Sequence, residues 1–166
     1  ALFYSTNSNR PIDVSFIGSL ARYSDRKIAL GMLAHNGVDV VQRGGVSEDR
    51  FSIANYADHM RKSKITLNFA RPVFDEPNFQ CKGRTIEATL CGALLFEQKN
   101  PETPRWFEPG VDYVEFEDEY ELVQRVRYFL QNERELLEMA ERGHRKALVE
   151  YSAKKYWKMV FHALQS

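Results

Sequence analysis

The residues best suited to chemistry stand together in segment 83–92, which reads GRTIEATLCG. Arg84 offers a bidentate donor for a phosphate or carboxylate group. Glu87 lies one helical turn further along the same face, where a carboxylate can accept two hydrogen bonds from a ribose diol. Gly83 and Thr85 belong to the turn that would open a helix, and the N–H groups of such a terminus favour anions. The segment therefore predicts a site for a phosphate group and a neighbouring ribose.

A simpler interpretation fits the same residues. Arg84 and Glu87 have the spacing of a surface ion pair on a helix. An acidic residue near a helix N-terminus is also stabilising without any ligand. Periodicity alone does not separate the two interpretations, so the position of the segment in the fold has to decide.

A glycine turn near the N-terminus is a second candidate. Gly18 and Ser19 close the apolar run at 14–17, and a glycine there lets a phosphate or sugar approach the backbone. Arg22 and Arg26 follow within a few residues and could contact the same group. The turn is not a GxGxxG motif, so an ordinary tight turn followed by a solvated basic face is the alternative.

The polar segment from Arg71 to Lys82 is the third candidate. It follows Asn68, which ends an otherwise apolar run, and it contains Glu76, an acid that could contact the phosphate or the sugar. A loop of this length between a strand and a helix is more often functional than incidental. If Asn68 is buried, its amide needs a hydrogen-bond partner, so a structural role is the alternative to a ligand role.

Short apolar runs alternate with amphipathic stretches along the chain. Strands separated by helices imply parallel strands and right-handed crossovers. The predicted fold is an α/β, Rossmann-like three-layer sandwich with a parallel sheet of about five or six strands and C-terminal helices. In such sheets ligands bind beyond the carboxyl ends of the strands, where all three candidate segments fall. We expect strands at 14–17, 38–41, 65–69, 93–96 and 113–116, and helices at 25–35, 53–60, 84–91, 103–109, 118–130, 132–147 and from 152 onward.

Two capping patterns indicate where C-terminal helices begin. Asp118 with Glu121, and Asn132 with Glu135, have the spacing of a capping box. The last helix carries an aromatic side, for which we expect core packing at least in part, with a protein interface as the alternative. The members of this side are Tyr156, Trp157 and Phe161.

Composition excludes several classes of function. With 166 residues, the chain is long enough for one domain with a full core. Lys plus Arg number 23 and so do Asp plus Glu, so no broad platform for nucleic acid or an anionic membrane is expected. No apolar stretch is long enough for a transmembrane helix. The 2 cysteines and 4 histidines have no zinc spacing, which predicts no metal site and a reduced, cytoplasmic setting.

Together the motifs resemble the C-terminal domain of group 1 glycosyltransferases with the GT-B fold, and most nearly the branch of CgeB-like spore-maturation proteins. They follow the family's order and spacing from Asp13 to about Tyr156. The matching stretches are DVSFIGS, YADHMRKSKITLNF, KGRTIEATLCGALLF, WFEPGVDYVEFED and ELVQRVRYFLQNERELLEMAERG.

The resemblance implies a nucleotide-sugar donor site. In the family, this domain binds the nucleoside diphosphate, so Arg84 would contact the phosphates and Glu87 the ribose. Gly18 and Ser19 match the glycine turn after the first strand. The resemblance also implies metal-independent transfer of a hexose-type sugar, with no cofactor besides the nucleotide-sugar substrate.

The resemblance has a consequence for domain organisation. Residues 1–166 would form a single nucleotide-sugar-binding domain, the C-terminal half of a GT-B enzyme. The N-terminal domain, which supplies the acceptor site in the family, would be the missing partner. The chain alone should therefore bind a donor and show little or no transfer.

One departure from the family, and two other functions, leave alternatives open. Many relatives carry a second glutamate upstream of the ribose-binding one, but that position is Phe79 here and Glu76 is out of register. Contacts with the donor sugar, the stereochemical outcome and the catalytic residues are therefore not assigned. The alternatives are a non-catalytic Rossmann-like module that binds another protein through the Trp157 face, and a nucleotide-sugar epimerase, whose acid and base residues are not visible.

Overall fold

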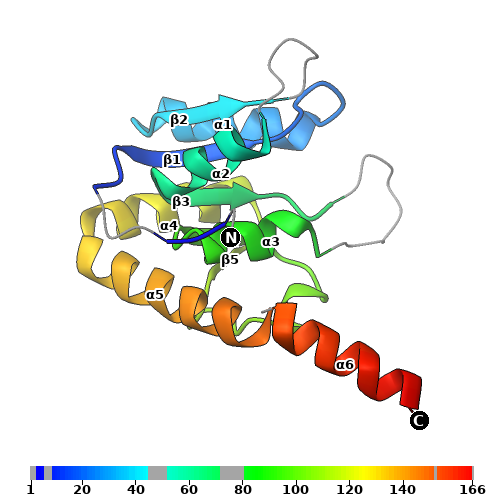
Figure 1. Cartoon of the computed structure of the whole chain (residues 1–166). Helices are drawn as coiled ribbons and strands as arrows, with labels where there is room; N and C mark the ends of the chain where they lie inside the picture. Colours follow the sequence, from blue (N-terminus) through cyan, green and yellow to red (C-terminus); the bar gives the residue numbers. More distant parts are fainter. Residues whose placement is uncertain (1–2, 6–8, 45–51, 72–80, 152, 166) are drawn as a thin grey trace.

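The computed structural model describes residues 3–5, 9–44, 52–71, 81–151 and 153–165. Strands and helices alternate along most of the described chain, and helices alone occupy its last part (Figure 1). The strands are β1 (Ile12–Ile17), β2 (Val40–Arg43), β3 (Ser63–Asn68), β4 (Leu94–Gln98) and β5 (Val114–Phe116). The helices are α1 (Ser24–His35), α2 (Ile53–Arg61), α3 (Gly83–Leu90), α4 (Glu119–Gln131), α5 (Glu133–Glu150) and α6 (Ala153–Gln165), with a 3-10 turn, η2, at Thr103–Arg105.

The strands form one sheet in the order β2-β1-β3-β4-β5. Every neighbouring pair is parallel, and Asn68 on β3 lies in register with Glu97 on β4. The predicted parallel α/β sandwich is therefore confirmed. Since all strands run the same way, their carboxyl ends share one edge of the sheet, and the polar ends of β3 and β4 meet there.

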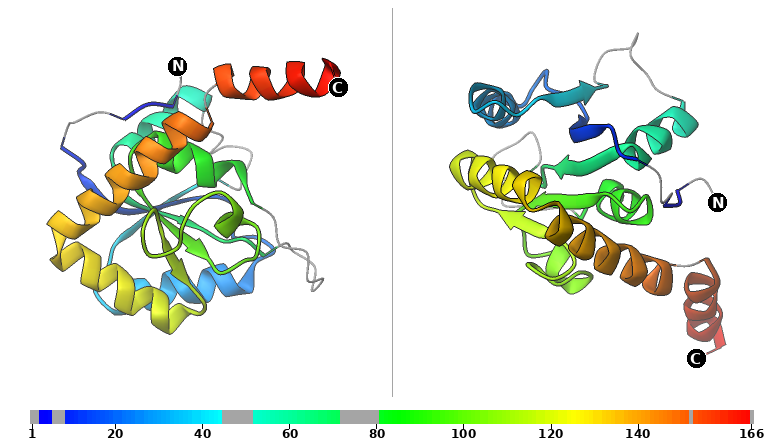
Figure 2. Two further views of the ribbon diagram at one scale, coloured as in Figure 1. Left: turned by 90° about the horizontal axis from the view of Figure 1, so that it is seen from below. Right: turned by 90° about the vertical axis from the view of Figure 1, so that its left-hand side faces the viewer.

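Helices cover both faces of the sheet. Figure 2 shows α1 and α4 on one face, with α2, α3 and α5 on the other. On β1, Phe16 packs into the apolar cluster with α1 and α4, and Ile17 packs into the cluster with α2 and α3. A strand covered on both faces reads as a continuous apolar run, which is why the sequence pattern identified this layer correctly.

Strand β4 is longer than the sequence pattern predicts. We expected it to end at Phe96, because Glu97 and Gln98 are polar, but all five residues of β4 are buried. Glu97 has 0% exposure and Gln98 6%. The carboxylate is accommodated because Asn68 on the neighbouring strand donates to it, a contact that the local sequence does not reveal.

One of the two predicted caps is confirmed. Asp118 Oδ1 accepts from the N–H of Glu121 at 2.8 Å at the start of α4. The cap predicted for Asn132 is wrong, because its side chain makes no cap hydrogen bond to α5. Its Nδ2 instead donates to the carbonyl of Tyr128 at 2.7 Å, so this amide closes the preceding helix.

Helix α6 extends from the end of α5 away from the body of the sheet in Figures 1 and 2. Trp157 is 54% exposed and Phe161 58% exposed, so core packing of these two side chains is not observed. The side chain of Tyr156 lies outside the described residues. Within the described ranges, no helix is both long and apolar enough to cross a membrane.

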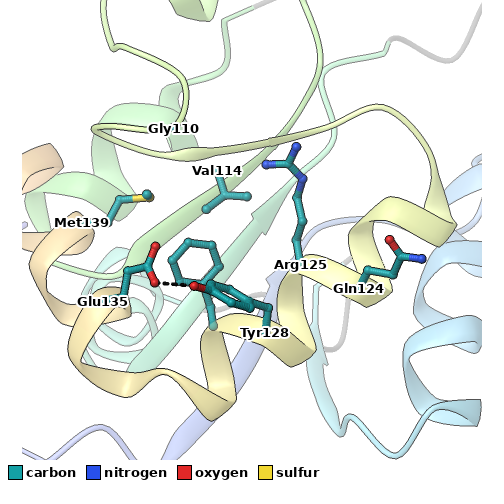
Figure 3. Close-up of a pocket in the computed structure, with 8 residues that line it drawn as sticks. Gly110, Val114, Gln124, Arg125, Tyr128, Glu135 and Met139 are labelled. Atoms are coloured by element: carbon teal, nitrogen blue, oxygen red, sulfur yellow. Dashed lines mark hydrogen bonds between the residues drawn. The ribbon is translucent and has the colours of Figure 1, made fainter.

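A hollow of about 470 Å³ lies between α4, α5 and the turn at Gly110 (Figure 3). Val114, the first residue of β5, lies on its floor. The Tyr128 hydroxyl donates to Glu135 Oε2 across it at 2.7 Å. None of the residues that line this hollow belongs to the three candidate segments, so it is separate from the site that the sequence predicts.

Candidate functional site

The first and third candidate segments meet at the carboxyl edge of the sheet. Asn68 ends β3, and α3 begins at Gly83 after the long connection. Lys82 occupies the N-cap position and its side chain makes no cap hydrogen bond, so it leaves the N-terminus of α3 uncapped. Such a terminus carries partial positive charge and suits an anion.

Arg84 lies across this edge. Its Nη1 donates to Asn68 Oδ1 at 2.9 Å, and its guanidinium lies 5.5 Å from the centre of the Phe16 ring. Its Nε is buried without a hydrogen-bond partner among the described residues. The ion pair with Glu87, which was the simpler interpretation, is not formed. Arg84 is therefore held by the Asn68 amide, the Phe16 ring and the nearby Tyr56 hydroxyl, and it forms no ion pair with Glu87.

Glu87 contacts a residue that the sequence did not single out. The Tyr56 hydroxyl, from α2, donates to Glu87 Oε2 at 2.7 Å. Burial raises the pKa of Tyr56, and although the Arg84 charge lowers it, the Glu87 carboxylate raises it again. Tyr56 therefore stays protonated and fixes one carboxylate oxygen of Glu87. The other, Oε1, lies 3.5 Å from the point that a Cβ on Gly83 would occupy, so it faces the start of α3.

Gly18 is required by packing at this edge. A Cβ at Gly18 would stand 2.8 Å from Phe16 Cζ and 3.3 Å from Arg84 Nη2. Its N–H donates to the carbonyl of Arg43 at 2.9 Å, which joins the end of β1 to the end of β2. The second candidate segment therefore touches the first, because the missing side chain of Gly18 makes room for Arg84.

The remaining residues of the glycine turn differ in position. Ser19 Oγ accepts from the N–H of Ala21 at 3.2 Å, so its hydroxyl shapes the turn. Arg22 is exposed. Arg26 is only 5% exposed, donates to the Ser19 carbonyl at 3.0 Å and stacks on Tyr23 at 3.3 Å from the ring centre. Arg26 thus braces the turn with the same guanidinium that we expected to contact a phosphate.

Lys82 is a cation of the site that sequence reasoning missed. Its Nζ donates to the carbonyl of Phe69, just after β3, at 2.5 Å. Burial lowers the pKa of Lys82 to about 8, and the nearby charges of Arg26 and Arg84 lower it further. Three basic side chains therefore gather at one edge. In the sequence, only the position of Lys82 directly before Gly83 and Arg84 indicated that it belongs to this site.

A buried carboxylate lies behind these cations. Glu97 accepts from Asn68 Nδ2 and from Thr85 Oγ1, and burial raises its pKa to about 7. Thr85 also donates its N–H to the Lys82 carbonyl, so both of its donors are used within the protein. Glu76 lies outside the described residues. In the described part of the chain no cluster of His, Cys, Asp and Glu has a metal-binding arrangement.

Comparison with known proteins gives a family and a fold. A family model described as "Glycosyl transferase-like" matches residues 6–160. No curated protein sequence matches the chain. Among solved structures, HepE of Anabaena in complex with UDP and glucose is similar at 13% identity and TM-score 0.77, over 99% of this chain and 54% of that one.

Two further structures show the same architecture. Sucrose-phosphate synthase of Thermosynechococcus elongatus is similar at 11% identity and TM-score 0.71, over 98% of this chain and 50% of that one. The C-terminal domain of LpcC, a glycosyl transferase group 1 family protein of Francisella tularensis, is similar at 10% identity and TM-score 0.66, over 92% of this chain and 97% of that one. At these identities the likeness establishes the fold, and the chain spans about half of the longer structures.

Proposed function

We propose that this chain, which belongs to the glycosyl transferase-like family, is the donor-binding domain of a glycosyltransferase and binds a nucleoside diphosphate sugar at the carboxyl edge of its sheet. The diphosphate lies at the N-terminus of α3 beside Arg84, and Glu87 accepts hydrogen bonds from the ribose diol. The diphosphate approaches closely to the backbone of Gly18, Ser19 and Gly83. Arg22, which is exposed, is a secondary phosphate contact, whereas Arg26 contributes its charge from behind the glycine turn. Glu76 is a candidate contact to the sugar.

One observation carries this proposal. Arg84 and Glu87 share one face of α3 but form no ion pair, since Arg84 donates to Asn68 and Glu87 accepts from the Tyr56 hydroxyl, which also lies against Arg84. A surface ion pair would neutralise both charges. Here the cation and the carboxylate are held apart, which suits a ligand with a phosphate at one end and a diol at the other.

The finer parts of the proposal follow the family. The transferred group is a hexose-type sugar, transfer needs neither a metal nor a cofactor, and an N-terminal domain of the same protein supplies the acceptor site. The HepE complex with UDP and glucose supports a nucleotide sugar as the donor class. The CgeB-like branch and a cytoplasmic setting remain predictions from the sequence motifs and from the two cysteines, Cys81 and Cys91, which form no disulfide.

Calorimetry tests donor binding. We expect the chain to bind at least one of UDP, GDP, ADP or TDP, or the corresponding sugar, with a Kd of roughly micromolar to millimolar. Arg84→Ala and Glu87→Ala should each weaken binding roughly tenfold or more, since each removes a charge-assisted contact. Absence of binding heat for all four nucleotides and their sugars would overturn the proposal.

Matched controls come from α5. Arg134 and Glu138 form an exposed ion pair at 2.8 Å on this helix. Arg134→Ala and Glu138→Ala remove the same charges far from the carboxyl edge, so they should leave the affinity unchanged. Equal losses in both sets of variants would mean that net charge, and not the site, determines binding.

A second candidate function is favoured by the exposed apolar face of α6. Trp157, Phe161 and Leu164 are 54%, 58% and 77% exposed. An apolar patch of this kind is typical of a protein interface. A non-catalytic interaction module would show no nucleotide binding and would self-associate through this face, which sedimentation of the wild type and of Trp157→Ala would detect.

A further inference from the structure

Glu97 is a fully buried carboxylate that the proposed donor contacts do not use. Its Oε1 accepts from Asn68 Nδ2 at 3.1 Å and from Asn100 Nδ2 at 3.4 Å. Its Oε2 accepts from Asn68 Nδ2 at 2.9 Å and from Thr85 Oγ1 at 3.0 Å. Both oxygens thus face donors from three different segments, β3, α3 and the turn after β4. An ionised carboxylate, which only accepts, satisfies all of them.

This arrangement fixes the orientation of the Asn68 amide. The Nδ2 end faces the Glu97 carboxylate, and the Oδ1 end accepts from Arg84 Nη1 at 2.9 Å. The reversed amide would place its oxygen against the carboxylate and its NH₂ against the guanidinium, and both contacts would be repulsive. A carboxylate on one side and a guanidinium on the other therefore allow one orientation.

Arg84 depends on this acceptor for its position. The other cations of the edge, Arg26 and Lys82, repel it, since the Arg84 charge lowers the pKa of both. The Phe16 ring supports the guanidinium from one side at 5.5 Å, and the Nε has no partner among the described residues. Without the Asn68 oxygen, repulsion would move Arg84 outward from the edge.

We propose that Glu97 is a positioning residue for the donor phosphate: it orients Asn68, which in turn aims Arg84. This role rests on the donor site proposed above. Glu97 is 0% exposed, so it reaches a ligand only through the other two side chains. A glutamine of the same shape has one acceptor oxygen where the carboxylate has two, so its NH₂ group faces either Asn68 Nδ2 or Thr85 Oγ1. The Asn68 amide is then held less firmly, and an Asn68 that turns presents an NH₂ group to Arg84.

The sign of the effect of Glu97→Gln on nucleotide affinity separates this role from simple electrostatics. Removing a negative charge near the site would by itself strengthen binding of an anion such as UDP. Loss of the Arg84 position should instead weaken it, roughly tenfold. We therefore measure the Kd of UDP by calorimetry for the wild type and for Glu97→Gln. Unchanged or tighter binding overturns the proposal.

A double-mutant cycle tests whether the effect passes through Arg84. In an Arg84→Ala background, Glu97→Gln should cause no further loss of affinity, because the side chain that it positions is gone. Asn68→Leu should weaken binding as much as Glu97→Gln, and the two together no more than either. Additive losses in the cycle would mean that Glu97 acts on the fold in general, which would overturn the role.

Thr66→Val is the matched control for a merely structural effect. Thr66 is buried on β3 like Asn68, and its hydroxyl lies 3.3 Å from that of Ser15. This substitution should lower the melting temperature and leave the Kd of UDP unchanged. A weaker Kd in Thr66→Val as well would assign the effect of Glu97→Gln to general destabilisation.

Two further outcomes are distinguishable. If the wild type binds no nucleotide, the proposed function and this role fall together. If Arg84→Ala weakens binding and Glu97→Gln does not, the proposed function stands and the role of Glu97 falls. Should Glu97→Gln not fold, the Arg84 Nε–H and Asn68 NH₂ resonances of the wild type decide. The chemical shifts of both groups should change over the pH range in which Glu97 titrates. An Arg84 Nε–H resonance that does not change over this range overturns the proposal.

Discussion

At the scale of single residues, Glu97 holds a titratable group away from water. Burial raises its pKa to about 7, from 4.5 in an unperturbed carboxyl, although donors from Asn68 and Thr85 oppose the shift. The folded protein therefore binds this proton more tightly than the unfolded chain. Ionised Glu97 destabilises the fold, which is consistent with a residue retained for the position of its neighbours.

The pH dependence of stability follows from this shift. Between about pH 4.5 and about pH 7 the folded state binds more protons at Glu97 than the unfolded state, so the free energy of unfolding should fall as pH rises. A shift of this size corresponds to roughly 3 kcal/mol. Urea unfolding of the wild type and Glu97→Gln from about pH 5 to about pH 8 measures it. Parallel pH profiles for the two proteins would contradict the prediction.

The sequence predicted part of the candidate site at this scale. Arg84 and Glu87 were predicted from their spacing on one helical turn, and the structure places both on the expected edge. Tyr56, Lys82 and Glu97 were not predicted, because each acquires its role from a contact across the fold. Local periodicity says nothing about which side chain from another helix or strand will reach a carboxylate.

At the scale of elements, α5 is positioned by a glycine. A Cβ at Gly143 would stand 2.4 Å from the backbone carbonyl oxygen of Asp112, so the helix can cross this turn only where the side chain is missing. Arg142 Nε donates to the Val111 carbonyl at 2.9 Å, and Lys146 pairs with Asp112 at 2.6 Å, on either side of the crossing. The crossing fixes α5 against the end of the sheet at β5.

Gly143→Ala should therefore destabilise the protein, because the carbonyl that it meets is backbone and cannot turn aside. We expect a loss of roughly 1–3 kcal/mol, more than the gain in helix propensity of about 1 kcal/mol. Gly31 in α1 is the matched control, since a Cβ there would meet nothing within 4 Å. Gly31→Ala should be neutral or stabilising in the same urea measurement. If Gly143→Ala leaves the free energy of unfolding unchanged, the turn at Asp112 moves to make room for the added methyl group, and the prediction is wrong.

Prediction of the elements succeeded where a pattern is local and failed where burial depends on distant partners. The apolar runs of β1 and β3 identified buried parallel strands. The end of β4 was placed too early because Glu97 and Gln98 look like solvent-facing residues. Asn132 was expected to cap α5, but it caps the end of α4, since a short polar side chain between two helices can serve either one.

At the scale of the whole molecule, the described residues make one sandwich with α6 projecting from it. The chain spans 54% of the HepE structure and 97% of the LpcC C-terminal domain. The edge that carries Arg84 is also the edge where ligands bind in open parallel sheets. If the proposed function is correct, the chain supplies the donor site, and we expect transfer to require a second domain.

The most direct test of the central claim is a nuclear magnetic resonance titration of the ¹⁵N-labelled chain with UDP. The account predicts shifts of the backbone amides of Gly18, Ser19 and residues 83–87 and of the Arg84 Nε–H group. Resonances of α6 and of the hollow between α4 and α5 should not move. Shifts confined to those two places, or none at the N-terminus of α3 at millimolar UDP, would contradict a donor site at this edge.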